Sequence, residues 1–386
     1  MIYLDSAASA LPFEDAVTFS PEPGNPSSDH SAGYAANAVL EKTRSLLSAM
    51  FGGRSSEYHF CSGATEAANL IIQGRCHFLK TANSTRNEII VSAIEHPAIF
   101  NTVKHMRQSG FIVHIVPVDH RGIIETSFIY DLLNEHTSMV LVMGVNNETG
   151  ARQPIDDIAK KVKTIDPDIS FICDGVQTLT KVSSPDLTYI DALIGSGHKL
   201  GAAMGVGFFY LNHRFRLSPL IFGGEQEAGV RPGTENIYGI ESLYRALVHH
   251  QKNADHYHNH VRALSLLLQK TLEQSNISFS INTQDGETSG YILSICFNGI
   301  DASRAIKFLS QRGICVSKGS ACSSVSPTPS RVLSAMKLSH AQMSSTLRVS
   351  FSPLNVKEDV LTFCAAMSEL HSYNVETSAL EQQSQM

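Results

Sequence analysis

Short apolar runs alternate with longer amphipathic stretches between about residues 57 and 210. The runs are rich in β-branched residues and predict strands at 88–92, 112–117, 139–145, 170–173 and 192–194. Strands and helices that alternate along a chain indicate a mostly parallel sheet. Residues 139–143 are apolar throughout, which is typical of a sheet covered by helices on both faces. The pattern therefore predicts an α/β domain.

The pattern changes near residue 236. Residues 236–271 predict one long helix, broken at most once, that leaves the large domain for a smaller one. Shorter elements of α+β character are predicted after it, at 292–297, 303–311, 314–317 and 359–373.

The domain boundaries follow from this change of pattern. We expect a large domain at 13–250 and a small domain formed by 1–12 together with 251–375. The polar residues 376–386, which include three glutamines, predict a disordered tail.

Composition narrows the class of protein. A net charge of −6 without a cluster of Lys and Arg argues against direct nucleic-acid binding. The N-terminus lacks the basic and apolar regions of a signal peptide, and no run approaches the roughly 20 apolar residues of a membrane span. Seven scattered cysteines, an odd number with no C-x2-C pair, favour a reducing cytoplasmic compartment over a disulfide framework or a zinc site.

One lysine stands in a setting typical of pyridoxal 5′-phosphate (PLP) enzymes. Lys199 ends the segment Ser196-Gly197-His198-Lys199, directly after a predicted strand, where it can carry the cofactor as a Schiff base. Asp174 lies 25 residues earlier at the end of another strand, suited to pair with the pyridinium nitrogen. Without the other segments, Lys199 would be interpreted as a surface charge and Asp174 as a helix N-cap.

Other segments supply contacts for the remaining parts of PLP. The turn before Ala64 and Thr65 opens a helix whose free N–H groups favour a phosphate, although an ordinary helix cap has the same sequence. Ser196 and His198 can complete that phosphate site. We expect three further contacts with the ring or its surroundings, from His96 stacking and carrying protons, from Gln177 donating to the phenolic oxygen, and from Gly197. The run Asn146-Asn147-Glu148 offers amide donors. Without the other segments, His96 would be interpreted as a structural histidine and Asn147 as a turn residue.

These segments, with Cys322 in the small-residue run Gly319-Ser320-Ala321-Cys322-Ser323-Ser324, resemble the cysteine desulfurases of the class V aminotransferase family. The resemblance covers nearly the whole chain, from Tyr3-Leu4-Asp5-Ser6-Ala7 to Thr346-Leu347-Arg348-Val349-Ser350. It implies a fold-type I PLP-dependent transferase with a large, mostly parallel sheet domain and a smaller α+β C-terminal domain. It implies that Asn147 is the amide donor near the cofactor. It also implies a homodimer in which Thr234 reaches the partner's cofactor phosphate.

The resemblance further implies a reaction. L-Cysteine is converted to L-alanine, a persulfide forms on Cys322, and sulfur passes to acceptor proteins for iron–sulfur clusters or tRNA thiolation. Arg348 and Asn147 then bind the substrate, with Arg348 on its carboxylate. The sequence departs from the family pattern at Gly201-Ala202-Ala203-Met204, at Lys318 and at Phe351-Ser352-Pro353. The alternatives are a selenocysteine lyase, an aminotransferase, or a partly inactive homologue that acts as a scaffold.

Overall fold

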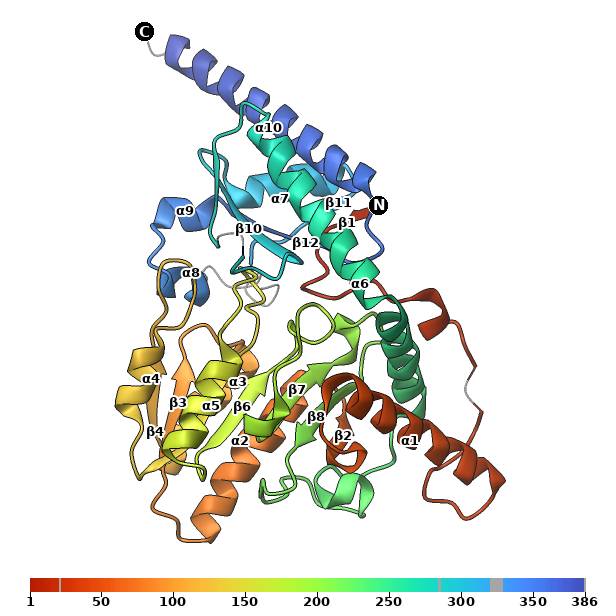
Figure 1. Cartoon of the computed structure of the whole chain (residues 1–386). Coiled ribbons are helices and arrows are strands. Elements are labelled where there is room, and N and C mark those ends of the chain that lie inside the picture. Colours follow the sequence, from red (N-terminus) through yellow and green to blue (C-terminus); the bar gives the residue numbers. More distant parts are fainter. Residues whose placement is uncertain (21, 284–285, 320–328, 385–386) are drawn as a thin grey trace.

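The computed structural model describes residues 1–20, 22–283, 286–319 and 329–384 (Figure 1). A large sheet with its helices forms one part of the molecule, and a smaller group of strands and helices lies beside it (Figure 1). The helix α6 (Ile237–Glu273) runs from the first part into the second, with non-helical backbone at Asn253.

The large sheet has seven strands in the order β2-β8-β7-β6-β5-β3-β4. Their bounds are Tyr58–Cys61, Gly207–Leu211, Ala192–Ser196, Ser170–Asp174, Thr137–Met143, Glu88–Ser92 and Ile112–Val116, in that order. The strands from β7 to β4 pair in parallel, whereas β8 is antiparallel to both of its neighbours. The predicted α/β fold with a mostly parallel sheet is confirmed.

Helices bury both faces of this sheet. Alternate residues of a strand point to opposite faces, so Phe208 belongs to one apolar core and Phe209 to the other. The first core receives α1 (Ser31–Phe51), α4 (Thr126–Leu132), α5 (Ile155–Ile165) and the first half of α6. The second receives α2 (Ala64–Thr81) and α3 (Pro97–Met106). This two-sided burial explains why β5 is buried along its whole length.

The smaller part of the molecule has a third apolar core. It contains an antiparallel sheet of β9 (Phe279–Ile281), β10 (Ile292–Phe297) and β12 (Thr346–Ser350), and a parallel pair of β1 (Ile2–Tyr3) with β11 (Ile314–Cys315). Its helices are α7 (Ala302–Gln311), α8 (Arg331–Ala335), α9 (His340–Ser344) and α10 (Lys357–Ser384). Residues from both ends of the chain therefore share one core.

The structure differs from the sequence prediction at the C-terminal end. Composition predicts a disordered tail from residue 376, but α10 continues to Ser384. The segment contains Ala, Leu, Glu and Gln, which favour helix through their backbone propensity even where no apolar stripe is present. None of the helices in the described ranges is long and apolar enough to cross a membrane.

Candidate cofactor site

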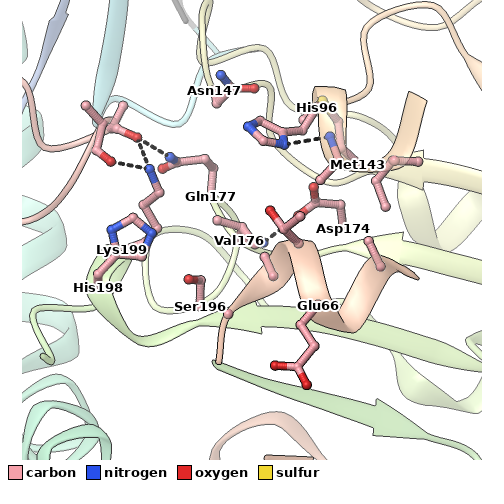
Figure 2. A pocket seen from close by; sticks show the side chains of 18 of the residues that line it. Glu66, His96, Met143, Asn147, Asp174, Val176, Gln177, Ser196, His198 and Lys199 are labelled. Atoms are coloured by element: carbon pink, nitrogen blue, oxygen red, sulfur yellow. Dashed lines mark hydrogen bonds between the residues drawn. The ribbon is translucent and has the colours of Figure 1, made fainter. Parts of the chain in front are cut away.

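A cavity of about 430 Å³ lies at the carboxyl ends of the parallel strands (Figure 2). Ligands of open α/β sheets bind at this edge. Most of the predicted site residues line the cavity, although they come from separate segments of the chain: Ala64, Thr65, His96, Asn147, Asp174, Gln177, Ser196, His198, Lys199 and Arg348. The tertiary fold therefore assembles them into one site.

Lys199 lies in a single 3-10 turn that follows β7. Its Nζ donates to the backbone carbonyl oxygens of Ala7 at 2.6 Å and Ala8 at 2.5 Å. The N-terminal segment thus forms one wall of the cavity, and Figure 2 shows the lysine amine turned toward it. Backbone carbonyls carry no signature in the sequence, so this contact was not predicted.

Asp174 is buried at the end of β6, and one of its carboxylate oxygens, Oδ1, accepts from the backbone N–H of Val176 at 3.0 Å. Burial raises the pKa of Asp174 to about 6, although that hydrogen bond and the positive charge of Lys199 oppose the rise. Burial removes the water that would stabilise the charged carboxylate. A cationic ring nitrogen beside Asp174 would supply that stabilisation instead.

The N-terminus of α2 enters the cavity without a capping side chain on Gly63. Glu66 also lines the cavity, but its carboxylate is already occupied, because it accepts from the backbone N–H of Ser62 at 2.7 Å and from Nε of Arg231 at 2.8 Å. A Cβ at Gly207 of β8 would lie 2.5 Å from Cα of Gly63, so only glycine allows this close approach. The N–H groups of Ala64 and Thr65, next to Ser196 and His198, are an arrangement that suits a phosphate.

His96 caps the start of α3 on the opposite side of the cavity. Its Nδ1 accepts from the backbone N–H of Ala98 at 3.2 Å, which leaves the ring proton on Nε2. Burial, with the nearby charges of Lys199 and Arg331, lowers the pKa of His96 to about 4. The ring is therefore neutral at pH 7.

Arg348 is buried in β12, with only 1% of its surface exposed. Its two terminal nitrogens donate to the backbone oxygen of Asn147 at 3.0 Å and to Oδ1 of Asp5 at 2.6 Å. Its buried Nε has no hydrogen-bond partner within the described residues. This guanidinium at the cavity wall suits a planar carboxylate.

Two predicted site residues within the described ranges do not line the cavity. Gly197 lies behind it, where a Cβ would meet the side chain of Val206 at 2.7 Å. Thr234 is exposed outside it. Cys322 lies outside the described residues. Lys318, which departs from the family pattern, donates from Nζ to Oγ of Ser303 at 2.8 Å.

The sequence did not indicate two other polar groups. The first is Lys181, which is buried and contacts Gln177. It does not directly follow the end of a strand and belongs to none of the motifs that predict the site. Asp5, the ion-pair partner of Arg348, lies 343 positions away in the chain, and only tertiary packing brings the two together.

Comparison with known proteins identifies the class. Residues 2–363 match the family described as aminotransferase class-V. The chain belongs to this family and, within it, to the cysteine desulfurases. The predicted fold type and the dependence of the family on PLP are thereby confirmed.

Individual relatives cover almost the whole chain. A cysteine desulfurase NifS from Azotobacter vinelandii is 33% identical over 368 residues, which are 93% of this chain and 90% of the relative. A solved structure of a NifS-like protein has a TM-score of 0.89 and 30% identity over 96% of this chain and 99% of its own. Another, titled SspA in complex with cysteine, has a TM-score of 0.78 and 30% identity over 92% of this chain and 100% of its own.

The cavity fits PLP in three respects. The uncapped start of α2 suits the phosphate, buried Asp174 suits the ring nitrogen, and Lys199 supplies the amine. When bound, PLP supplies an electron sink that stabilises negative charge on an amino acid.

Proposed function

We propose that this protein is a cysteine desulfurase that converts L-cysteine to L-alanine and carries the sulfur as a persulfide on Cys322. The observation that carries the proposal is the pairing of two sites in one cavity. Lys199 and Asp174 suit the cofactor, and buried Arg348 with its unpartnered Nε suits the carboxylate of an amino acid. The names of the relatives support cysteine as that amino acid.

The residues of the cavity take distinct roles in this proposal. Arg348 binds the substrate carboxylate, and the amine of Lys199 takes the proton from Cα. Neutral His96 carries its ring proton on Nε2, because Nδ1 already accepts from the backbone of Ala98 and its pKa of about 4 leaves the ring uncharged at pH 7. In this proposal His96 donates a hydrogen bond from Nε2 to the substrate sulfur, and taking up a proton during the cycle would first require Nδ1 to release Ala98.

The sulfur step is assigned to Cys322. Its thiolate attacks Sγ of the substrate, so an S–S bond forms as the Cβ–Sγ bond breaks. The electron pair of the broken bond remains on the carbon skeleton, and protonation at Cβ gives alanine. Such an attack requires thiolate character and access. Among the described cysteines, all of which are unpaired, Cys315 is half-buried and the others are buried.

We further propose that the persulfide passes to a protein acceptor, either an iron–sulfur cluster scaffold or a tRNA thiolation protein, and the NifS name of the relative supports the first of these. A homodimer, with Thr234 at the partner's cofactor phosphate, is proposed from the same family. The unpaired state of the described cysteines supports a reducing, cytoplasmic location.

A single turnover experiment tests the proposal. PLP-loaded protein is given cysteine, alanine is measured, and peptides are examined for an added sulfur atom by mass spectrometry. We expect alanine, with the sulfur on the peptide that contains Cys322. Cys322→Ser should bind PLP normally and form neither product.

Cys315→Ser is the matched control and should behave as the native protein. Alanine release by the Cys322→Ser variant would overturn the desulfurase assignment in favour of a lyase. Absence of alanine from the native, PLP-loaded protein would instead favour a scaffold.

A further inference from the structure

Lys181 is a buried lysine that the proposed reaction does not use. Its side chain is 7% exposed and lies in the turn after β6. The charged and titratable groups around it are Lys199, Arg348, His198, His250 and Tyr291. No carboxylate forms an ion pair with Lys181 within the described ranges. Burying a cation without a counter-charge destabilises a fold, so stability does not explain this lysine.

The ammonium of Lys181 has a defined partner in Gln177. Its Nζ donates to Oε1 of Gln177 at 2.5 Å. An ammonium can only donate, so Oε1 must face it and Nε2 must face the other way. Nε2 indeed donates to the carbonyl oxygen of Ala7 at 3.0 Å. If the amide were reversed, Nε2 of Gln177 would face the ammonium of Lys181 and Oε1 would face the carbonyl oxygen of Ala7. Neither pair can form a hydrogen bond.

This orientation extends to Lys199 through a shared acceptor. The carbonyl oxygen of Ala7 accepts from both Gln177 and Lys199, at 3.0 Å and 2.6 Å. Figure 2 shows the amide of Gln177 and the amine of Lys199 meeting at the N-terminal segment. A cavity of about 20 Å³ is lined by both Lys181 and Lys199, so the two amines are also neighbours in space.

We propose that Lys181 is a positioning residue of the cofactor pocket: it fixes the amide of Gln177 with its N–H groups toward the cofactor, and its charge favours the unprotonated nitrogen on Lys199. The inference rests on the proposed function, because that proposal identifies PLP as the group that Lys199 carries. Through Gln177, Lys181 would orient an N–H donor toward the phenolic oxygen of PLP when the cofactor is bound. Through its charge, it favours the form of the Lys199 nitrogen that can act as a base.

The electrostatics agree with this geometry. Burial, followed by the charges of Lys199 and Arg348, lowers the pKa of Lys181 to about 7. Lys181 is a cation below that pH and loses its charge above it. The interaction is mutual, so the cation at position 181 disfavours a proton on the nitrogen at position 199 as long as Lys181 is charged. Removing the cation should raise the pH at which that nitrogen loses its proton.

The test is a spectroscopic pH titration of PLP-loaded protein. The Schiff-base nitrogen on Lys199 gives different visible spectra when protonated and unprotonated, and the measurement requires no turnover. We expect Lys181→Met to raise the transition by about one pH unit. Lys181→Arg should stay near the native value. Lys160→Met, which changes an exposed lysine on α5, is the control and should leave the transition unchanged.

Two further variants separate the parts of the proposal. Lys181→Gln keeps a donor to Gln177 without the charge, so it should shift the transition while PLP affinity stays near native. In a Gln177→Ala background, Lys181→Met should not weaken PLP affinity further, because the amide through which Lys181 acts is gone.

The failing outcomes are distinct. A native transition in Lys181→Met, or equal losses of PLP affinity in the presence and absence of Gln177, would overturn the inference. If Lys181→Met does not fold, the pH titration of Lys181→Gln is the deciding measurement. A transition at the native pH in Lys181→Gln would overturn the charge effect. A shifted transition in protein that makes no alanine would sustain the inference while refuting the desulfurase assignment.

Discussion

In the proposed function Arg348 binds the carboxylate of the substrate, and its side chain is already held in place. Asp5 and the carbonyl of Asn147 hold the two terminal nitrogens, which fixes the plane of the guanidinium. Its buried Nε has no hydrogen-bond partner within the described residues. A charged group fixed in advance loses little conformational entropy when its ligand arrives.

Replacing Arg348 should therefore act on substrate binding. We expect Arg348→Met to raise KM for cysteine by a factor that corresponds to about 2–5 kcal/mol, with a normal PLP spectrum. Steady-state alanine production measures it. Arg312→Met removes an exposed ion pair with Glu369 and is the control, with an expected effect below about 1 kcal/mol. An unchanged KM in Arg348→Met would leave Arg348 a structural role only.

Asp174 makes cofactor affinity depend on pH. Its carboxyl has a pKa of about 6 in the protein without PLP, above its ordinary value. It is ionised above that pH and neutral below it, and only the ionised form pairs with a protonated ring nitrogen. PLP affinity should therefore be full above about pH 6 and decline as the pH falls through that value. His96, with a pKa of about 4, stays neutral over this range.

Absorbance titrations of the protein with PLP between about pH 5 and pH 8 check this expectation. Asp174→Asn should bind weakly at every pH and lack the dependence. If the PLP affinity of Asp174→Asn declined by the same amount at low pH, the pH dependence would belong to another group.

Several site residues could be predicted because each lies at the carboxyl end of a strand or in the segment that follows it. Lys199, Asp174 and His96 follow this rule, and the sheet brings them together. The contacts of Lys199 with Ala7 and Ala8 could not be predicted, because any residue offers a carbonyl and the partners are about 190 positions apart.

At the scale of elements, the site depends on how closely β8 approaches the start of α2. Gly63 occupies the N-cap position of the helix without a capping side chain, and Gly207 faces it with no space for a Cβ. The position of the helix N-terminus, and therefore of the proposed phosphate site, is fixed by this contact.

Gly207→Ala should displace the phosphate site. A Cβ 2.5 Å from Cα of Gly63 forces the backbone apart, so we expect PLP affinity to fall about tenfold or more by absorbance titration. Gly110→Ala is the control, because its φ of 85° strains an alanine while no atom lies within 4 Å of the added Cβ. That variant should lose stability and keep its affinity. Equal affinity in both variants would contradict the proposed phosphate site.

The buried strands were the most predictable elements. The strands at 88–92 and 292–297 have the predicted bounds, because their apolar runs end where burial ends. The long helix is confirmed with one break, at Asn253. The C-terminal part of α10 was missed because its sequence has helix propensity without an apolar stripe.

At the scale of the whole molecule, Thr234 is exposed and outside the cavity of its own chain. We expect it to contact the phosphate of a second copy, so the protein should sediment as a dimer at micromolar concentration. Thr234→Ala should weaken PLP binding without dissociating the dimer. A monomer that binds PLP tightly would show that the site is complete within one chain.

The meeting of the two chain ends has a consequence for biosynthesis. Ser350 donates its backbone N–H to the carbonyl of Leu4 at 2.8 Å, and Arg348 pairs with Asp5. A growing chain folds from its N-terminal side, but here residues 2–6 pair with Gly313, Cys315 and Ser350, which leave the ribosome late. Residues 7–10 find their partners at Gln177, His198 and Lys199, so this wall can form with the large sheet. We therefore expect the side of the cavity that holds Arg348 to be completed last, after the segments that suit the cofactor.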